Sequence, residues 1–313
     1  MKVLLSLLFA LSAFGADSQF NGRWDIKVSD EPRGRAWWLE VQGAGTPQIR
    51  GKFVGAPGGQ LDEIPEIAVK DSELVFSFER VYRGVSDKPV KATYRARLSG
   101  DKLIGTTTFE GNRRAPIQWV GMRAPELPEK DDGRWKKGKV IELFNGKDLS
   151  GWSPVAPNGQ LRWVVRNGLL ANLEGAGDIA SHQKFMNFDL HVEYRIEKGS
   201  NSGVGLRGRY EVQIFDDYGK PPAKGGNGAL YSRIVPKVNA SKAPGEWQTL
   251  DVRLIGREVT VTLNGQKIID RGIIEGLTAM ATDPYEAEPG PITLQGDHGA
   301  VQFRRIAVTP LTR

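Results

Sequence analysis

The 313-residue sequence contains no cysteine. This absence excludes disulfides, a cysteine nucleophile, a thiolate zinc site and an iron–sulfur cluster. The sequence also lacks a long apolar segment with a 3.6-residue period, and past its N-terminus no apolar run is long enough to cross a membrane. Glycine and proline separate many short segments instead, so we expect an all-β protein without a membrane span.

Charge of one sign is only slightly in excess. The chain has 43 Lys and Arg against 37 Asp and Glu, a formal net charge of +6. The one basic cluster lies at residues 134–139, and no basic stripe is interleaved with aromatic residues. These features exclude a nucleic-acid partner.

The N-terminus has the pattern of an export signal. Lys2 precedes a short run of Val, Leu, Phe and Ala, and small residues at Ala13 and Gly15 suit cleavage after Gly15. We therefore predict a signal peptide at residues 1–15 and a periplasmic or secreted mature protein.

A polar segment at residues 124–139 divides the rest of the chain. It contains Pro125 and Pro128 and shows no hydrophobic periodicity, so it is predicted to be a linker. The predicted domains are residues 16–123 and residues 140–313.

Both domains alternate apolar and polar residues with period two, the mark of antiparallel strands with one buried face. In the first domain Trp24, Ile26 and Val28 begin seven or eight such strands, which predicts an antiparallel barrel that closes its own edges. Gly22-Arg23-Trp24 resembles the start of lipocalin-like barrels, and no chemistry is assigned to this domain. In the second domain the many strands and the Asn264-Gly265 hairpin signal predict a two-sheet β-sandwich.

Residues 203–208 match the G-x-G-x-x-G pattern of dinucleotide-binding proteins. That motif requires a helix directly after it. Here an alternating strand, Tyr210 to Ile214, follows. The match therefore indicates no nucleotide site.

Chemistry is expected where alternation places charged residues opposite the core. Acids, guanidiniums and amides occupy these positions in the second domain, which suits a polyhydroxylated ligand because each group can bond vicinal hydroxyls. A solvated face of ion pairs is the alternative. His191 and Glu193 lie on one strand face, and a third ligand from elsewhere would complete a metal site, so a divalent metal is left open.

The second half resembles the 3-keto-disaccharide hydrolase domain family. The motifs that carry the resemblance occur in order along residues 140–311: Leu143-Phe144-Asn145-Gly146-Lys147-Asp148-Leu149-Ser150-Gly151-Trp152, Asn201-Ser202-Gly203, Tyr210-Glu211-Val212-Gln213-Ile214, Gly228-Ala229-Leu230-Tyr231, Gly290-Pro291-Ile292-Thr293-Leu294-Gln295 and His298-Gly299. Arg305 departs from the family pattern, where Asn is usual. The resemblance implies a concanavalin A-like jelly-roll sandwich. It also implies cleavage of glycosides whose sugar a separate oxidoreductase has oxidised to the 3-keto form.

The expected reaction assigns roles to these residues by chemical inference. A C3 ketone acidifies the C2 hydrogen, so a base can form an enolate that expels the aglycone from C1, after which water adds. The candidate catalytic residues are Glu211 and Glu193 as base and acid, Arg207 as enolate clamp and His298 as a second acid. The candidate substrate-binding residues are Gln213, Gln295, Arg195, Tyr231 and Asp216.

Two alternatives stay open. Direct hydrolysis by two carboxylates would need no enolate. A non-catalytic carbohydrate-binding protein of the cell envelope would use the same fold, although it should present exposed aromatic residues on its face. The expected partner in the enzymatic case is a 3-keto glycoside, and the sequence sets no oligomeric state.

Overall fold

The computed structural model describes residues 17–29, 33–82, 84–113 and 115–313. These residues divide into two compact units. The first comprises residues 17–29 and 35–124, and the second comprises residues 33–34 and 125–313. The predicted signal peptide, residues 1–15, lies outside the described residues.

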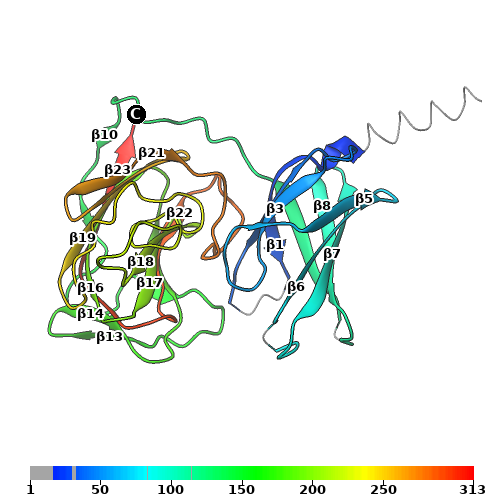
Figure 1. Cartoon of the computed structure of the whole chain (residues 1–313). Helices are drawn as coiled ribbons and strands as arrows, with labels where there is room; N and C mark the ends of the chain where they lie inside the picture. Colours follow the sequence, from blue (N-terminus) through cyan, green and yellow to red (C-terminus); the bar gives the residue numbers. More distant parts are fainter. Residues whose placement is uncertain (1–16, 30–32, 83, 114) are drawn as a thin grey trace, which may run out of the picture. The chain divides into compact units, whose positions relative to one another are not determined.

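The first unit is one antiparallel sheet that curls on itself (Figure 1). Its strands run in the order β4-β3-β2-β1-β9-β8-β7-β6-β5, so the first and last strands in sequence pair with each other. Their bounds are β1 Gly22–Val28, β2 Trp37–Gln42, β3 Arg50–Val54, β4 Asp62–Glu63, β5 Glu66–Lys70, β6 Glu73–Arg80, β7 Val90–Ser99, β8 Lys102–Phe109 and β9 Ile117–Arg123.

The interior of this sheet is filled by aromatic side chains. Phe76 and Tyr94 stack with ring centroids 4.7 Å apart, and Phe53 meets Tyr94 edge-on at 5.0 Å. Between β4 and β5 no strand pairing is recorded in the described part of the chain, so the complete closure expected from the sequence is not found. Pro65 lies between these two strands and has no N–H to donate, which disfavours a ladder there.

The second unit is a sandwich of two antiparallel sheets (Figure 1). The back sheet has the order β13-β14-β23-β16-β19-β20-β21, with β10 and β11 also paired to β23, and the front sheet has the order β12-β15-β22-β17-β18. The bounds are β10 Lys136–Lys137, β11 Ile141–Glu142, β12 Trp152–Pro154, β13 Trp163–Arg166, β14 Leu169–Asn172, β15 Ile179–Phe185, β16 Phe188–Ile196, β17 Asn201–Leu206, β18 Tyr210–Phe215, β19 Gln248–Ile255, β20 Glu258–Leu263, β21 Gln266–Ile273, β22 Gly290–Leu294 and β23 Val301–Thr312.

Alternation along the strands builds the core between these sheets. On β16 every second residue from Phe188 to Ile196 is buried, while the residues between them are partly exposed. Val204 and Leu206 on β17 and Ile292 and Leu294 on β22 supply the apolar face of the front sheet. The predicted all-β fold class, an antiparallel barrel domain followed by a β-sandwich, is confirmed, with the difference that the first sheet is curled and is not closed between β4 and β5.

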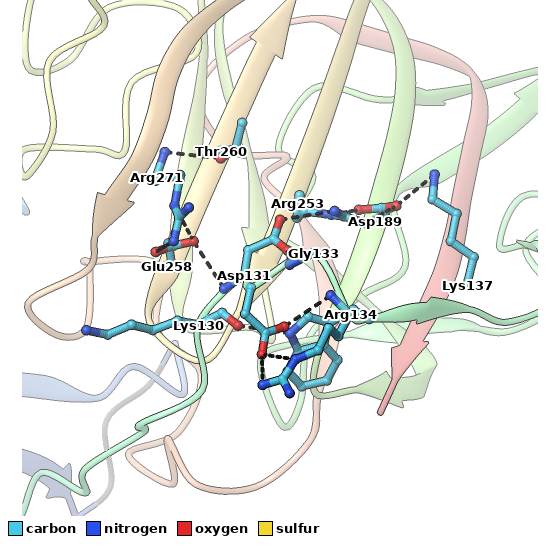
Figure 2. Close-up of polar contacts among 12 residues, drawn as sticks. Lys130, Asp131, Gly133, Arg134, Lys137, Asp189, Arg253, Glu258, Thr260 and Arg271 are labelled. Atoms are coloured by element: carbon cyan, nitrogen blue, oxygen red, sulfur yellow. Dashed lines mark hydrogen bonds and ion pairs between the residues drawn. The ribbon is translucent and has the colours of Figure 1, made fainter.

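Residues 125–137 form a strap that is tied to the back sheet (Figure 2). Arg253 on β19 bonds Asp131 of the strap at 3.0 Å and Asp189 on β16 at 2.7 Å. The Asp131 N–H donates to Glu258, and β10 pairs with the end of β23. Most of the segment predicted to be a linker is therefore part of the second unit.

No helix in the described ranges has the length and apolar character needed to cross a membrane.

Candidate functional site

A cluster of polar side chains lies on the face of the front sheet that points away from the core. Two glycines of β17 form its floor. Gly205 pairs with Glu211 on β18 and with Thr293 on β22. Gly203 pairs with Gln213 on β18, and its carbonyl accepts the N–H of Gln295 at 2.9 Å. We call this set, with His298 and Asp178 described below, the front-face cluster.

These two positions need glycine because a side chain would overlap its neighbours, and not because the backbone has an unusual conformation. Neither has a positive φ. A Cβ at Gly203 would lie 2.6 Å from Glu211 Oε1, and one at Gly205 would lie 2.0 Å from Thr293 Oγ1. The G-x-G that resembles a nucleotide motif therefore serves to make room for Glu211 and Thr293 above the middle strand.

Two polar atoms in this cluster have unused hydrogen-bonding capacity. Thr293 Oγ1 and Gln295 Oε1 are buried and have no hydrogen-bond partner among the described residues. An unsatisfied buried polar atom costs about 1–3 kcal/mol, so such atoms usually have a water molecule or a ligand as partner. Glu211 and Gln213 are each only 3% exposed.

The amide of Gln213 lies against the Glu211 carboxylate. With the amide oriented to satisfy its neighbours, its nitrogen donates to Glu211 Oε1 at 3.2 Å and to the carbonyl of Ser202 at 3.0 Å. Such an orientation is inferred from the hydrogen-bond network. The bond fixes the direction of the carboxylate above Gly203.

The segment between β21 and β22 covers the cluster. The N–H of Glu211 donates to Thr278 Oγ1 at 3.0 Å, and Met280 lies above Gly205. This segment is anchored at its far end by Glu286, which is fully buried and bonds Arg257 at 2.5 Å and the Tyr210 hydroxyl at 2.7 Å. The covering segment is thus held in place by a buried ion pair.

His298 is the exposed member of the cluster, with a side chain that is 47% exposed. Its Nδ1 bonds the carboxylate of Asp297, and this bond raises the pKa of His298, whereas burial lowers it. The nearby carboxylates of Glu211 and Asp178 raise that pKa further. The structure therefore brings His298 and Glu211 together with Asp178, a buried acid that the sequence interpretation missed because it precedes β15 in an irregular segment.

Glu193 and Arg195, two other predicted site residues, lie on the outer face of the back sheet. Glu193 bonds Arg304 and lies 3.2 Å from His191 Nε2, and Arg195 Nε donates to Gln302 at 2.6 Å. Burial opposes ionisation of Glu193, but its bonds to Arg304 and His191 outweigh this effect and lower its pKa. The structure does not bring these residues to Glu211.

Arg207, the predicted enolate clamp, is fully buried away from the cluster. Its guanidinium donates to the carbonyl of Gly256 and to Met186 Sδ and lies over the ring of Tyr210, 5.1 Å from its centroid. Burial lowers the pKa of Arg207. These contacts hold the end of β17 and leave the enolate of the expected reaction without this cation.

The remaining predicted residues lie near β18. Asp216 accepts the N–H of Gly199 at 2.7 Å, so its carboxylate fixes the turn between β16 and β17. Tyr231 is partly buried, and its N–H donates to the carbonyl of Glu211 at 2.9 Å. Tyr231 therefore adjoins the front-face cluster, and Asp216 serves a neighbouring turn.

A groove of about 360 Å³ lies on the outer face of the back sheet, not over the front-face cluster. Its charges are engaged with one another: Asp189 with Arg253 and Lys137, His191 with Asp251, and Arg305 with Glu142. The front-face cluster differs from this groove, because it contains two buried side-chain atoms without a partner, Thr293 Oγ1 and Gln295 Oε1, whereas no described side chain that lines the groove has such an atom. In the described part of the chain, no group of three His, Asp or Glu side chains is arranged to hold a metal.

Residues 139–309 match the family model of the 3-keto-alpha-glucoside-1,2-lyase-like domain. A 3-keto-disaccharide hydrolase of Bacteroides thetaiotaomicron is 24% identical over an alignment of 215 residues, and the match covers 55% of this chain and 72% of that protein. Two solved structures from Parabacteroides distasonis, each described as a candidate glycosyl hydrolase, are 29% and 22% identical, with TM-scores of 0.49 and 0.46. They cover 59% and 56% of this chain, and 94% and 100% of their own chains.

These matches place the protein among glycosyl hydrolase-like, carbohydrate-active proteins. The family match spans more than half of the chain and includes every residue of the front-face cluster. Through its second unit, the chain belongs to the family defined by the 3-keto-alpha-glucoside-1,2-lyase-like domain.

Proposed function

We propose that the second unit cleaves the glycosidic bond of 3-keto glycosides at the front-face cluster. The observation that carries this proposal is the arrangement of Glu211 and His298. A buried carboxylate, aimed by Gln213, lies near a more exposed imidazole whose pKa is raised by Asp297, Glu211 and Asp178. One face therefore offers a base and an acid that are held by different elements.

The proposed reaction uses these two groups in sequence. Glu211 accepts the C2 proton that the C3 ketone has acidified, and the electron pair moves onto the ketone oxygen as an enolate. The enolate expels the aglycone by breaking the bond between C1 and the glycosidic oxygen, which takes its proton from the His298 imidazolium. Water then adds to C1 of the unsaturated product, and C2 regains a proton.

The enolate needs donors other than Arg207. Gln295 follows β22 and can donate from its Nε2, since its Oε1 only accepts, and the hydroxyl of Thr293 on β22 is a second donor. Donors that point to the developing oxyanion stabilise it without reorganisation. We assign this role to the Gln295 amide, because Thr293 is fully buried whereas Gln295 is partly exposed.

A substrate comparison combined with two variants tests the proposal. Wild-type protein should cleave a 3-keto glucoside and leave the parent glucoside intact, because without the ketone the C2 proton is out of reach of a carboxylate base. Glu211→Gln should lower kcat by about 100-fold or more. Glu193→Gln should stay near the wild-type rate, since Glu193 is on the other sheet.

Three outcomes would contradict this assignment. Equal cleavage of both sugars would indicate an ordinary glycosidase. A larger loss in Glu193→Gln than in Glu211→Gln would move the chemistry to the back sheet. Binding of the sugar without any cleavage would indicate a carbohydrate-binding protein.

We also propose that the protein is exported and matures by removal of residues 1–15. The support is the charged start, the apolar run and the small residues before position 16. N-terminal sequencing of protein recovered outside the cytoplasm should begin at Ala16. An intact Met1 in the exported fraction would contradict the predicted cleavage.

A further inference from the structure

The turn that carries His298 is held far more tightly than an exposed turn requires. It connects β22 of the front sheet to β23 of the back sheet. A Cβ at Gly296 would lie 2.4 Å from the carbonyl of Gly177, and a Cβ at Gly299 would lie 2.8 Å from the N–H nitrogen of Asn201. The backbone on both sides of His298 is thus closely packed against neighbouring segments.

One side chain makes three of the bonds that hold this turn. Asn172, the last residue of β14, donates from Nδ2 to the carbonyl of Gly296 at 2.9 Å and to that of Gly299 at 2.7 Å. Its Oδ1 accepts the N–H of Val301 at 2.8 Å. The two carbonyls lie on either side of His298 in sequence, so the amide closes the turn around that residue.

A fourth bond links the same turn to the acid beneath it. The N–H of Gly296 donates to Asp178 Oδ1 at 3.0 Å. The charged groups that face His298 are therefore fixed on three separate segments: Asp297 in the turn, Asp178 before β15 and Glu211 on β18.

We propose that Asn172 is a positioning residue for His298. Its amide holds the turn so that the imidazole, bonded to Asp297, stays near the carboxylates of Glu211 and Asp178. Asn172 lies on the back sheet, and its side chain bonds backbone groups of the turn and of Val301, so it has no part in proton transfer. The catalytic consequence rests on the proposed function, whereas the structural consequence does not.

The experiment uses the full-length protein and two readouts. The chain has three histidines, so NMR titration resolves each imidazole separately and needs no substrate. In Asn172→Ala the turn loses three bonds, so the pKa of His298 should fall as its bond to Asp297 loosens and as the imidazole moves away from Glu211 and Asp178. The titration of His191, on the back sheet, should stay as in the wild type.

A matched variant controls for general loss of stability. Asn264 makes a similar clamp in the β20–β21 hairpin: Oδ1 accepts the Thr249 N–H at 2.9 Å, and Nδ2 donates to the carbonyl of Ala240 at 2.8 Å. Asn264→Ala should destabilise the fold and leave the His298 titration unchanged. Asn172→Ser keeps one donor and should give a shift between wild type and Asn172→Ala; it is the variant to measure if the alanine protein does not fold.

The second readout is turnover of a 3-keto glycoside. In Asn172→Ala, misplacement of His298 should lower kcat by about 10-fold or more. KM should change less, because the position of the acid is lost and not the binding of the substrate. An unchanged His298 titration in a folded Asn172 variant, or an equal shift in Asn264→Ala, would overturn the proposal. If the wild type cleaves no 3-keto glycoside, the proposed function fails and the titration still decides the role of Asn172.

Discussion

At the scale of single residues, the contrast between Glu211 and Arg207 shows what fixes a side chain in the site. Both positions are odd-numbered, and simple alternation assigns both to the polar face. Glu211 lies within β18, where alternation applies, and its side chain does reach that face. β17 ends at Leu206, and Arg207 has a φ of 53°, so the strand phase is broken before its side chain.

The sequence therefore predicts the face of a residue only while the strand continues. A left-handed backbone position after a strand is a turn property that the apolar pattern does not reveal. Arg207 was misplaced for this reason. Asp178 was missed for another reason, since an isolated acid before a strand gives no periodic signal.

The glycine floor gives a prediction at this scale. Gly205→Ala should lower the free energy of unfolding by about 1–3 kcal/mol, because the new Cβ overlaps Thr293 Oγ1 and forces side chains to move. Urea unfolding measures the difference. Turnover should fall too, since Glu211 flanks the same glycine.

Gly177→Ala is the matched control for that change. Gly177 has no atom within 4 Å of a built Cβ and no positive φ, so alanine fits there. Its unfolding free energy should equal or exceed that of the wild type. If Gly205→Ala and Gly177→Ala lowered the free energy of unfolding equally, a Cβ at position 205 would not be sterically hindered.

At the scale of strands and sheets, period-two alternation predicts the strands well and their neighbours poorly. Glu193 on β16 and Glu211 on β18 both follow the outward-facing pattern, and both are indeed on outward faces. The two strands belong to opposite sheets, however, so these carboxylates face away from each other. Sheet membership depends on pairing between distant segments, such as β16 with β23, which a local pattern does not encode.

The β16–β19 pairing predicts a dependence of stability on pH. His191 is directly opposite Asp251, and its Nδ1 lies 2.7 Å from the Asp251 carboxylate. This bond raises the pKa of His191 above 6.5, against the effect of burial, and Glu193 adds to the increase. Protonated His191 therefore stabilises the fold at pH values below its unfolded pKa, and this contribution is lost as pH rises through the folded pKa.

His191→Asn isolates that contribution. The difference in unfolding free energy between wild type and variant should be largest at about pH 6 and should shrink toward about pH 8. Urea unfolding across this range measures it, and His298 cancels because it is present in both proteins. A difference that stays constant with pH would mean that the His191–Asp251 bond does not depend on the imidazolium.

At the scale of the whole molecule, the strap changes where the second folding unit begins. The family match begins at residue 139, but the compact unit begins its continuous segment at residue 125. Arg257, which anchors the covering segment through Glu286, also donates to the carbonyl of Pro125 at 3.0 Å. The strap and the segment over Glu211 thus share one guanidinium.

The strap also follows the back sheet closely near its start. Gly256 has a φ of 54°, and a Cβ there would lie 2.4 Å from the carbonyl oxygen of Glu129. Past Asp131, Trp135 contacts the guanidinium of Arg313, 5.1 Å from the ring centroid. The strap is held by backbone and charge contacts, and such contacts need polar residues. A free linker is polar as well, so the sequence pattern did not distinguish a strap from a linker.

Two fragments of the second unit test this boundary. Residues 125–313 should unfold with a free energy about 1–3 kcal/mol higher than residues 139–313, because the shorter fragment loses the Asp131–Arg253 pair, the Arg257–Pro125 bond and the β10–β23 ladder. Asp131→Asn in the longer fragment removes one of these contacts and should cost less than the truncation. Turnover should also fall in the shorter fragment, since Arg257 supports the segment that carries Thr278 and Met280 over Glu211. Equal stability and equal turnover in the two fragments would show that the strap merely lies on the sandwich, and residue 139 would then be the functional start of the unit.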